Sequence, residues 1–177
     1  MGDSSNKSTD LAKRIKDENC TPEELSALVG ISSMNDRLIA VHKNTGSEAL
    51  EKLSSSKDAL TREFVTGNAN TPLKILLQLA DDFPRAFLLN PAFEMLALED
   101  PGALERLYEP TLARILAQKE CPASIVNWAF KHYSRKSTFN SQIMLGIVQN
   151  PAVPVKIINS ILKLNVEVDL TCQECLL

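Results

Sequence analysis

Apolar residues recur at helical spacing after each of several short polar segments. After Thr21-Pro22, the side chains of Leu25, Leu28 and Val29 fall on one face of a helix. Threonine can cap a helix start, and proline fits the first turn because the N–H it lacks would have no partner there. Similar starts follow at four places: Gly46-Ser47, Thr71-Pro72, Cys121-Pro122 and Val153-Pro154. The pattern predicts a series of short amphipathic helices.

A second, shorter apolar element lies between these starts. It ends at Asn44, at Asn68 and at Asn90. Asparagine tolerates the left-handed conformation that often closes a helix, so we expect a tight corner at each of these positions. One copy of about 25 residues cannot bury its own apolar face, so successive copies are expected to stack.

One segment resembles the leucine-rich repeat variant family. Residues 68–82 match the family's order of Asn, Thr-Pro, spaced leucines and Asp, while residues 19–44 and 44–68 are similar to it less closely. The resemblance implies a right-handed superhelix of α-helices and short 3₁₀-type helices, related in logic to HEAT and armadillo proteins. Some members hold an iron–sulfur cluster on several N-terminal cysteines. Only Cys20 lies in that region here, so we expect no cofactor.

We therefore expect an all-α fold, a right-handed α-solenoid of stacked short helical repeats. The helical-repeat domain is predicted at residues 19–166, after a disordered leader and short entry helix at 1–18 and before a loose tail at 167–177. Between Asn90 and Asn150 the spacing lengthens, and Asp100-Pro101-Gly102 predicts a corner before a further short helix. This irregular stretch is where we expect any specificity to lie.

Composition narrows the function classes. The chain has 177 residues, 44% of them hydrophobic and 23% charged, which is typical of a folded domain. A net charge of -3 provides no overall positive field for nucleic acid or anionic lipid. Four scattered cysteines and no apolar leader favour reduced thiols and a cytoplasmic location. No apolar run approaches the roughly 18 residues of a membrane span.

The cysteine pair Cys172-x-x-Cys175 has a spacing that suits one edge of a metal site or a redox pair. A complete metal site needs two more ligands, and Cys20 and Cys121 are remote in sequence. Two ordinary thiols in a tail are the favoured interpretation. Metal or redox use of Cys172 and Cys175 stays as an alternative.

A basic segment at residues 131–136 is the candidate binding surface. Five residues compose this surface: Trp128, Lys131, Tyr133, Arg135 and Lys136. Neighbouring cations and aromatic rings suit a phosphate backbone with stacked bases, although a solvated helix end explains them more simply. The two histidines, His42 and His132, are interpreted as solvent-facing helix residues.

The sequence contains no nucleophile elbow, phosphate loop or glycine-rich cofactor motif. We therefore expect a non-catalytic scaffold that binds a protein partner. Nucleic-acid binding through residues 131–136 is the first alternative, and a metal or redox role of the C-terminal pair is the second.

Overall fold

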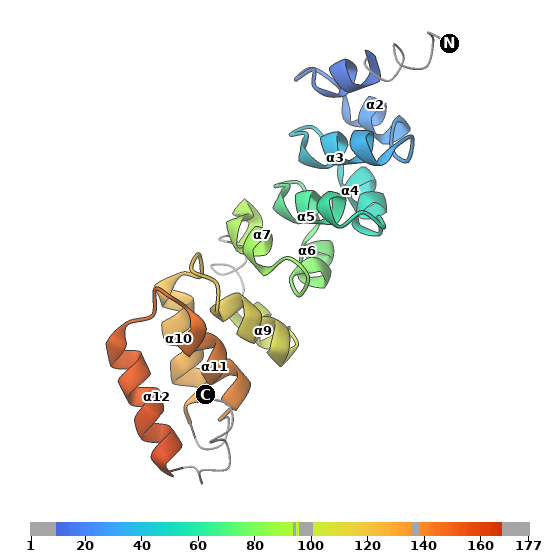
Figure 1. Ribbon diagram of the computed structural model, residues 1–177. Helices are drawn as coiled ribbons and strands as arrows, with labels where there is room; N and C mark the ends of the chain where they lie inside the picture. Colours follow the sequence, from blue (N-terminus) through green and yellow to red (C-terminus); the bar gives the residue numbers. More distant parts are fainter. Residues whose placement is uncertain (1–9, 94, 96–100, 136–138, 168–177) are drawn as a thin grey trace. The chain divides into compact units, whose positions relative to one another are not determined.

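The computed structural model describes residues 10–93, 95, 101–135 and 139–167 (Figure 1). All regular elements in this part of the chain are helical, as the sequence predicts. After a helical segment at residues 10–15, the helices are α2 (Pro22–Ala27), α3 (Ser33–Val41), α4 (Ser47–Ser54), α5 (Ala59–Gly67), α6 (Leu73–Leu79), α7 (Pro84–Leu89), the 3₁₀ helix η1 (Pro101–Arg106), α9 (Glu109–Leu116), α10 (Ala123–Tyr133), α11 (Ser141–Gln149) and α12 (Val155–Glu167).

The chain divides into two compact units, residues 1–104 and 105–177. In the first unit α3, α5 and α7 pack side by side in one row, and α2, α4 and α6 form a second row beside it (Figure 1). In the second unit α9 and α10 both pack against α11. The expected limits of the leader, repeat domain and tail stay predictions.

The helix starts follow the predicted pattern at Thr21 but not at Thr71. Thr21 forms a capping box, in which its Oγ1 accepts from the Glu24 N–H at 3.3 Å and its own N–H donates to Glu24 Oε2 at 3.1 Å. Thr71 is buried, and its hydroxyl donates to the Val65 carbonyl at 2.5 Å instead of capping α6. Pro72 is therefore the N-cap of α6, and Thr71 closes the preceding corner.

The asparagines act by a different mechanism from the one predicted. Asn68 follows α5 with φ -78°, which is not left-handed. Its Nδ2 donates to the carbonyls of Ala40 at 2.8 Å and His42 at 3.1 Å, and its Oδ1 accepts from the Asn70 N–H at 2.9 Å. The side chain therefore ties its own corner to the corner before it.

The same three bonds recur at two later corners. Asn90 donates to Thr66 at 2.7 Å and to Asn68 at 2.8 Å, and it accepts from the Ala92 N–H. In the second unit Asn150 donates to Leu116 at 2.8 Å and Gln118 at 2.9 Å, and it accepts from the Ala152 N–H. All three asparagine side chains are buried. Among the described residues only Gly30 has a positive φ, so the predicted left-handed asparagines are wrong.

A close helix crossing holds the second unit. A Cβ placed on Gly146 of α11 would clash with the backbone carbonyl of Ala113 in α9. Any larger residue would force the two helices apart. The expected short helix after residue 100 is also present, as η1, with Ala103 and Leu104 buried.

Replacing Asn68 by alanine is expected to lower the free energy of unfolding by about 2 kcal/mol, because it removes three hydrogen bonds. The Ala40 carbonyl and the Asn70 N–H lose this partner, and the His42 carbonyl keeps only the Thr45 N–H. Asn68→Asp should cost more, since a carboxylate oxygen then faces those carbonyls. Urea denaturation measures both changes. Asn127, exposed on α10, provides the control, and Asn127→Ala should change stability by less than about 0.5 kcal/mol. Equal losses of stability in Asn68→Ala and Asn127→Ala would contradict the stabilising role of the corner amide.

Gly146→Ala is expected to destabilise the protein by about 1 kcal/mol or more, because overpacking against Ala113 outweighs the helix propensity gained. At Gly67 in α5, no atom beyond its chain neighbours and the nearby backbone of its own helix lies within 4 Å of the position that a Cβ would take. Gly67→Ala should therefore leave stability unchanged or raise it by about 0.5 kcal/mol. Thermal unfolding of the two variants compares the same substitution in crowded and open surroundings. A Gly146→Ala variant as stable as the wild type would disprove the close contact between α9 and α11.

Candidate functional site

Apolar side chains are exposed along the row formed by α3, α5 and α7. On α3, Met34, Leu38 and Val41 lie one helical turn apart and so share one side of the helix. Met34 is 62% exposed and Val41 is 55% exposed. Equivalent positions of α5 and α7 extend this surface, which we call the α3–α5–α7 face and define by six residues: Met34, Leu38, Val41, Leu60, Phe64 and Leu89.

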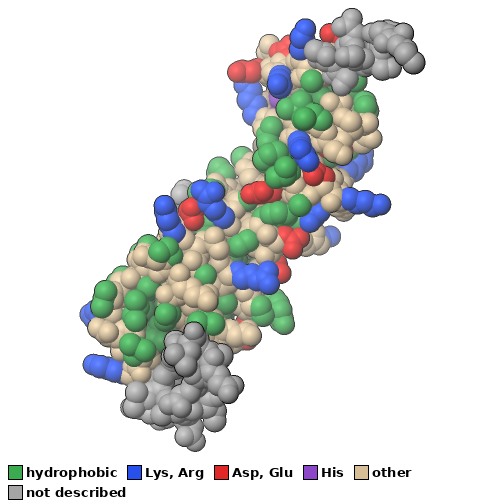
Figure 2. Space-filling model, in the orientation of Figure 1, with side chains coloured by type: hydrophobic (Ala, Val, Ile, Leu, Met, Phe, Trp, Pro, Cys, Tyr) green, Lys and Arg blue, Asp and Glu red, His purple; other side chains and the backbone are tan. Residues whose placement is uncertain are grey.

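Leu38 and Phe64 are half-buried and also contact the core, so this face continues from the packed interior to solvent. Figure 2 shows exposed hydrophobic side chains between charged ones over the helices of the first unit. Scattered exposed leucines are ordinary on protein surfaces, whereas a grouped apolar surface is typical of binding sites. Its grouping on neighbouring helices makes the α3–α5–α7 face the candidate binding surface.

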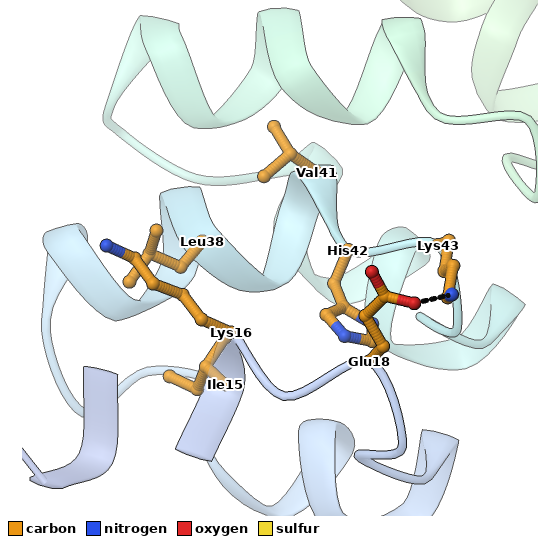
Figure 3. A pocket seen from close by; sticks show the side chains of 7 residues that line it. All are labelled: Ile15, Lys16, Glu18, Leu38, Val41, His42 and Lys43. Carbon is orange, nitrogen blue, oxygen red and sulfur yellow. Dashed lines mark hydrogen bonds and ion pairs between the residues drawn. The ribbon is translucent and has the colours of Figure 1, made fainter. Parts of the chain in front are cut away.

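An open pocket of about 270 Å³ lies at the N-terminal end of this face (Figure 3). Seven residues line this pocket: Ile15, Lys16, Glu18, Leu38, Val41, His42 and Lys43. Lys43 Nζ lies 2.8 Å from Glu18 Oε2, and this ion pair lowers the pKa of Glu18. The Lys16 side chain extends along Leu38 and away from that pair (Figure 3).

His42 is fixed by hydrogen bonds at both ring nitrogens. Nδ1 accepts from the Asn44 N–H at 3.1 Å, and Nε2 lies 3.0 Å from the Asp17 carbonyl. Because a carbonyl can only accept, these partners assign the proton to Nε2. His42 is half-buried and is the C-cap of α3, so its interpretation as a solvent-facing helix residue is wrong.

His42, and not Asn44, therefore occupies the corner position of Asn68 and Asn90. Asn44 lies two residues later and makes a second pair of bonds, from Nδ2 to the carbonyls of Glu18 at 2.8 Å and Cys20 at 3.0 Å. Asn70 makes the equivalent bonds to Lys43 and Thr45. The sequence pattern aligned asparagine with asparagine and missed a histidine that makes the same kinds of bond.

An ion pair between Arg37 and Asp58 connects α3 to the N-cap of α5. The guanidinium makes two 2.8 Å bonds to the carboxylate, which also caps α5 by accepting from Thr61. Arg37 and Thr61 together hold the pKa of Asp58 well below its usual range. The pair is therefore charged at neutral pH and fixes the two helices relative to each other.

The basic segment offers less to a ligand than the sequence suggested. Lys131 and Arg135 are exposed and Trp128 is half-buried, but Tyr133 is only 8% exposed and Lys136 lies outside the described residues. Tyr133 is therefore wrongly placed in the predicted binding surface. Its ring is unavailable for stacking on a base.

His132 also differs from its interpretation as a solvent-facing residue. Its ring stacks on the Trp128 ring with 5.7 Å between the ring centroids, and its centroid lies 4.7 Å from that of the Tyr133 ring. Its Nδ1 lies 3.7 Å from Glu105 Oε1. Burial, together with Glu109 and Glu105, raises the pKa of Tyr133. The aromatic residues thus pack on one another beside two carboxylates, which would repel a phosphate backbone.

The described cysteines are buried, free thiols. Burial raises the pKa of Cys121 to about 12, so this thiol stays protonated and unreactive at neutral pH. The predicted candidates Cys172 and Cys175 lie outside the described residues. Within the described ranges no three His, Cys, Asp or Glu side chains gather as metal ligands, and no helix there combines the length and apolar character of a membrane span.

His42→Asn is expected to change the free energy of unfolding by less than about 0.5 kcal/mol, because asparagine makes the same bonds at the other corners. His42→Leu should cost about 1 kcal/mol, since the Asn44 N–H then loses its partner and the Asp17 carbonyl keeps only the Cys20 N–H. Chemical denaturation compares the two variants. A proton–nitrogen correlation spectrum of the wild-type ring tests the assignment directly, and a proton on Nδ1 would refute it.

Comparisons with protein-family models, with curated proteins and with solved structures gave no match. The resemblance to the leucine-rich repeat variant family thus stays a prediction from the sequence.

Proposed function

We propose that the chain is a non-catalytic helical-repeat scaffold that binds a protein partner through the α3–α5–α7 face. The observation that carries this proposal is the exposure of Met34 on α3, Leu60 on α5 and Leu89 on α7, three successive helices of one row. The free energy gained by covering such side chains favours association with another apolar surface. Half-buried Leu38 and Phe64 provide firm positions beneath them, as in the centre of many protein interfaces.

We also infer that the recurring corners build a right-handed α-solenoid of the leucine-rich repeat variant kind. Support comes from corner residues bonded to the preceding corner 25, 26 and 22 residues earlier in the first unit. In a stack of this kind each element contacts only its neighbours, which leaves long helix rows open to a partner. A cytoplasmic location is part of the proposal and is supported by the free thiols of Cys20 and Cys121.

Nucleic-acid binding is the weaker candidate. Lys131 and Arg135 are available, but the neighbouring Tyr133 is buried and Glu105 lies beside the same aromatic group. A metal or redox role of Cys172 and Cys175 has no support among the described residues. Protein binding remains the function that this surface supports best.

The double variant Met34→Lys with Leu60→Lys is expected to fold normally and lose partner binding. Met34 is 62% exposed and Leu60 44% exposed, and neither belongs to the buried core, so the substitutions remove apolar contact area and add charge with little cost to the core. Proteins retained from native extract by the wild-type chain should be lost from the variant. For a purified partner the affinity should fall by at least about tenfold.

Two exposed apolar residues of α12 provide the matched control. Val155→Lys with Leu162→Lys makes the same chemical change in the second unit and should leave binding intact. Retention of the same proteins by both double variants would refute the proposed face. Salt-sensitive retention on RNA or DNA that is lost on Arg135→Glu would instead favour the nucleic-acid candidate.

A further inference from the structure

We propose that the pocket between residues 10–16 and α3 receives an apolar side chain from an acidic peptide segment of the partner, and that Lys16 pairs with a carboxylate of that segment. This inference rests on the proposed function and adds the chemical class of the partner. It concerns one end of the α3–α5–α7 face, where that face meets unpaired positive charge.

The size of the pocket favours a side chain over a small molecule. Its volume of about 270 Å³ falls below the roughly 300–1,000 Å³ of sites that enclose cofactors and drug-sized ligands. Leu38 and Val41 supply apolar atoms to its wall, and Ile15, which is fully buried, borders it from the core. An open apolar depression of this size suits one leucine, isoleucine or phenylalanine of a segment lying across the surface.

The charges around the pocket are unevenly compensated. Glu18 is paired with Lys43. Asp17 keeps its negative charge, because its hydrogen-bond partner Asn19 is neutral, but it does not line the pocket. Lys13 and Lys16 are exposed, and no described carboxylate forms an ion pair with either of them. Lys16 lines the pocket, and Lys13 precedes it by three residues in the sequence. Lys16 therefore places at the pocket rim one cation without an ion-pair partner, which a carboxylate would complement.

His42 adds no cation to this rim in the state that the structure shows. Both of its ring nitrogens are occupied by backbone partners, and its proton lies on Nε2. Arg14, between the two lysines, is paired with Glu24. Lys16 is therefore the cation that borders the apolar wall and has no described partner, which directs an acidic residue of the segment to this side of the pocket (Figure 3).

Peptides selected from a random phage-displayed library against the folded full-length chain test this inference. Fusion to the phage coat leaves no free peptide C-terminus, so a selected carboxylate comes from Asp or Glu. We expect enrichment of peptides that place Leu, Ile or Phe within a helical turn of an acidic residue. A synthetic peptide of the enriched sequence then serves as the probe in fluorescence anisotropy.

Lys16→Glu should weaken binding of this peptide about fivefold, the scale of an exposed ion pair. A peptide with lysine in place of its acidic residue should recover binding to Lys16→Glu and not to wild type. Lys16→Met removes the charge without adding another and should show a smaller loss. Val41→Gln should weaken binding about fivefold by removing apolar contact, and glutamine is already present before the corner in α11 as Gln149.

Lys74→Glu on α6 is the matched control, because Lys74 is an exposed lysine of the other helix row, and it should leave the affinity unchanged. Thermal unfolding of each variant separates lost binding from lost folding. Enrichment of basic or uncharged peptides would overturn the inference, as would peptide affinities unaffected by both Lys16→Glu and Val41→Gln. In either case the proposed function survives if Met34→Lys with Leu60→Lys still abolishes partner retention, and both fail if it does not.

Discussion

The buried corner amide is the interaction on which the stacking of this protein depends. A carboxamide offers two donor hydrogens and an acceptor oxygen, so one side chain can satisfy two carbonyls behind it and one N–H ahead of it. Asn68, Asn90 and Asn150 all use it in this way. Helix ends leave such carbonyls without intrahelical partners, and leaving them buried and unpaired would be costly. The amide therefore solves the helix-end problem of one corner by means of the next.

The corner requires a side chain that can donate and accept hydrogen bonds, and more than one residue type can do so. His42 supplies one donor and one acceptor from its ring, and it makes one bond backward and one forward. At the first corner Asp17 accepts from the Asn19 N–H at 2.9 Å, as the asparagines do from theirs, but a carboxylate has no hydrogen to donate backward. Among the described residues no earlier corner precedes it, so the missing donor costs nothing there. Among the described residues, every buried side-chain nitrogen or oxygen has a hydrogen-bond partner, which agrees with this matching of donors to acceptors at the corners.

Local rules predicted the parts of the fold that depend on local physics. Helix periodicity predicted the all-α class, and Thr21-Pro22 predicted a helix start that the structure contains. The corners could not be predicted in the same way, because the partners of Asn68 lie in a preceding corner 26 and 28 residues away. The sequence correctly placed asparagine at the corners of Asn68 and Asn90. Asparagine's tolerance of the left-handed conformation, however, suggested that the backbone closes the corner, whereas the side chain does so by hydrogen bonds. His42 was missed since its equivalence to asparagine appears only when both ring nitrogens have known partners.

The candidate site was harder to predict than the fold for a related reason. The cationic and aromatic residues near position 131 looked like a surface, yet Tyr133 faces the interior and His132 packs on Trp128. The residues of the pocket wall, Ile15 and Lys16, come instead from a region expected to be a leader and entry helix. A single apolar residue before a corner does not indicate a binding surface until the position of the neighbouring helix is known.

The corner amides also explain why the α3–α5–α7 face is free to vary. They join successive corners through backbone carbonyls, so stacking places little demand on the helix positions that point away from the core. The residue directly before each corner is Val41, Gly67 or Leu89 in the first unit, a wide range of size at one structural position. The corner positions themselves hold His or Asn, and each of these side chains bonds to the preceding corner and to a following N–H. A chain arranged in this way can change what it binds by changing the exposed face while the bonds that hold its helices together stay the same.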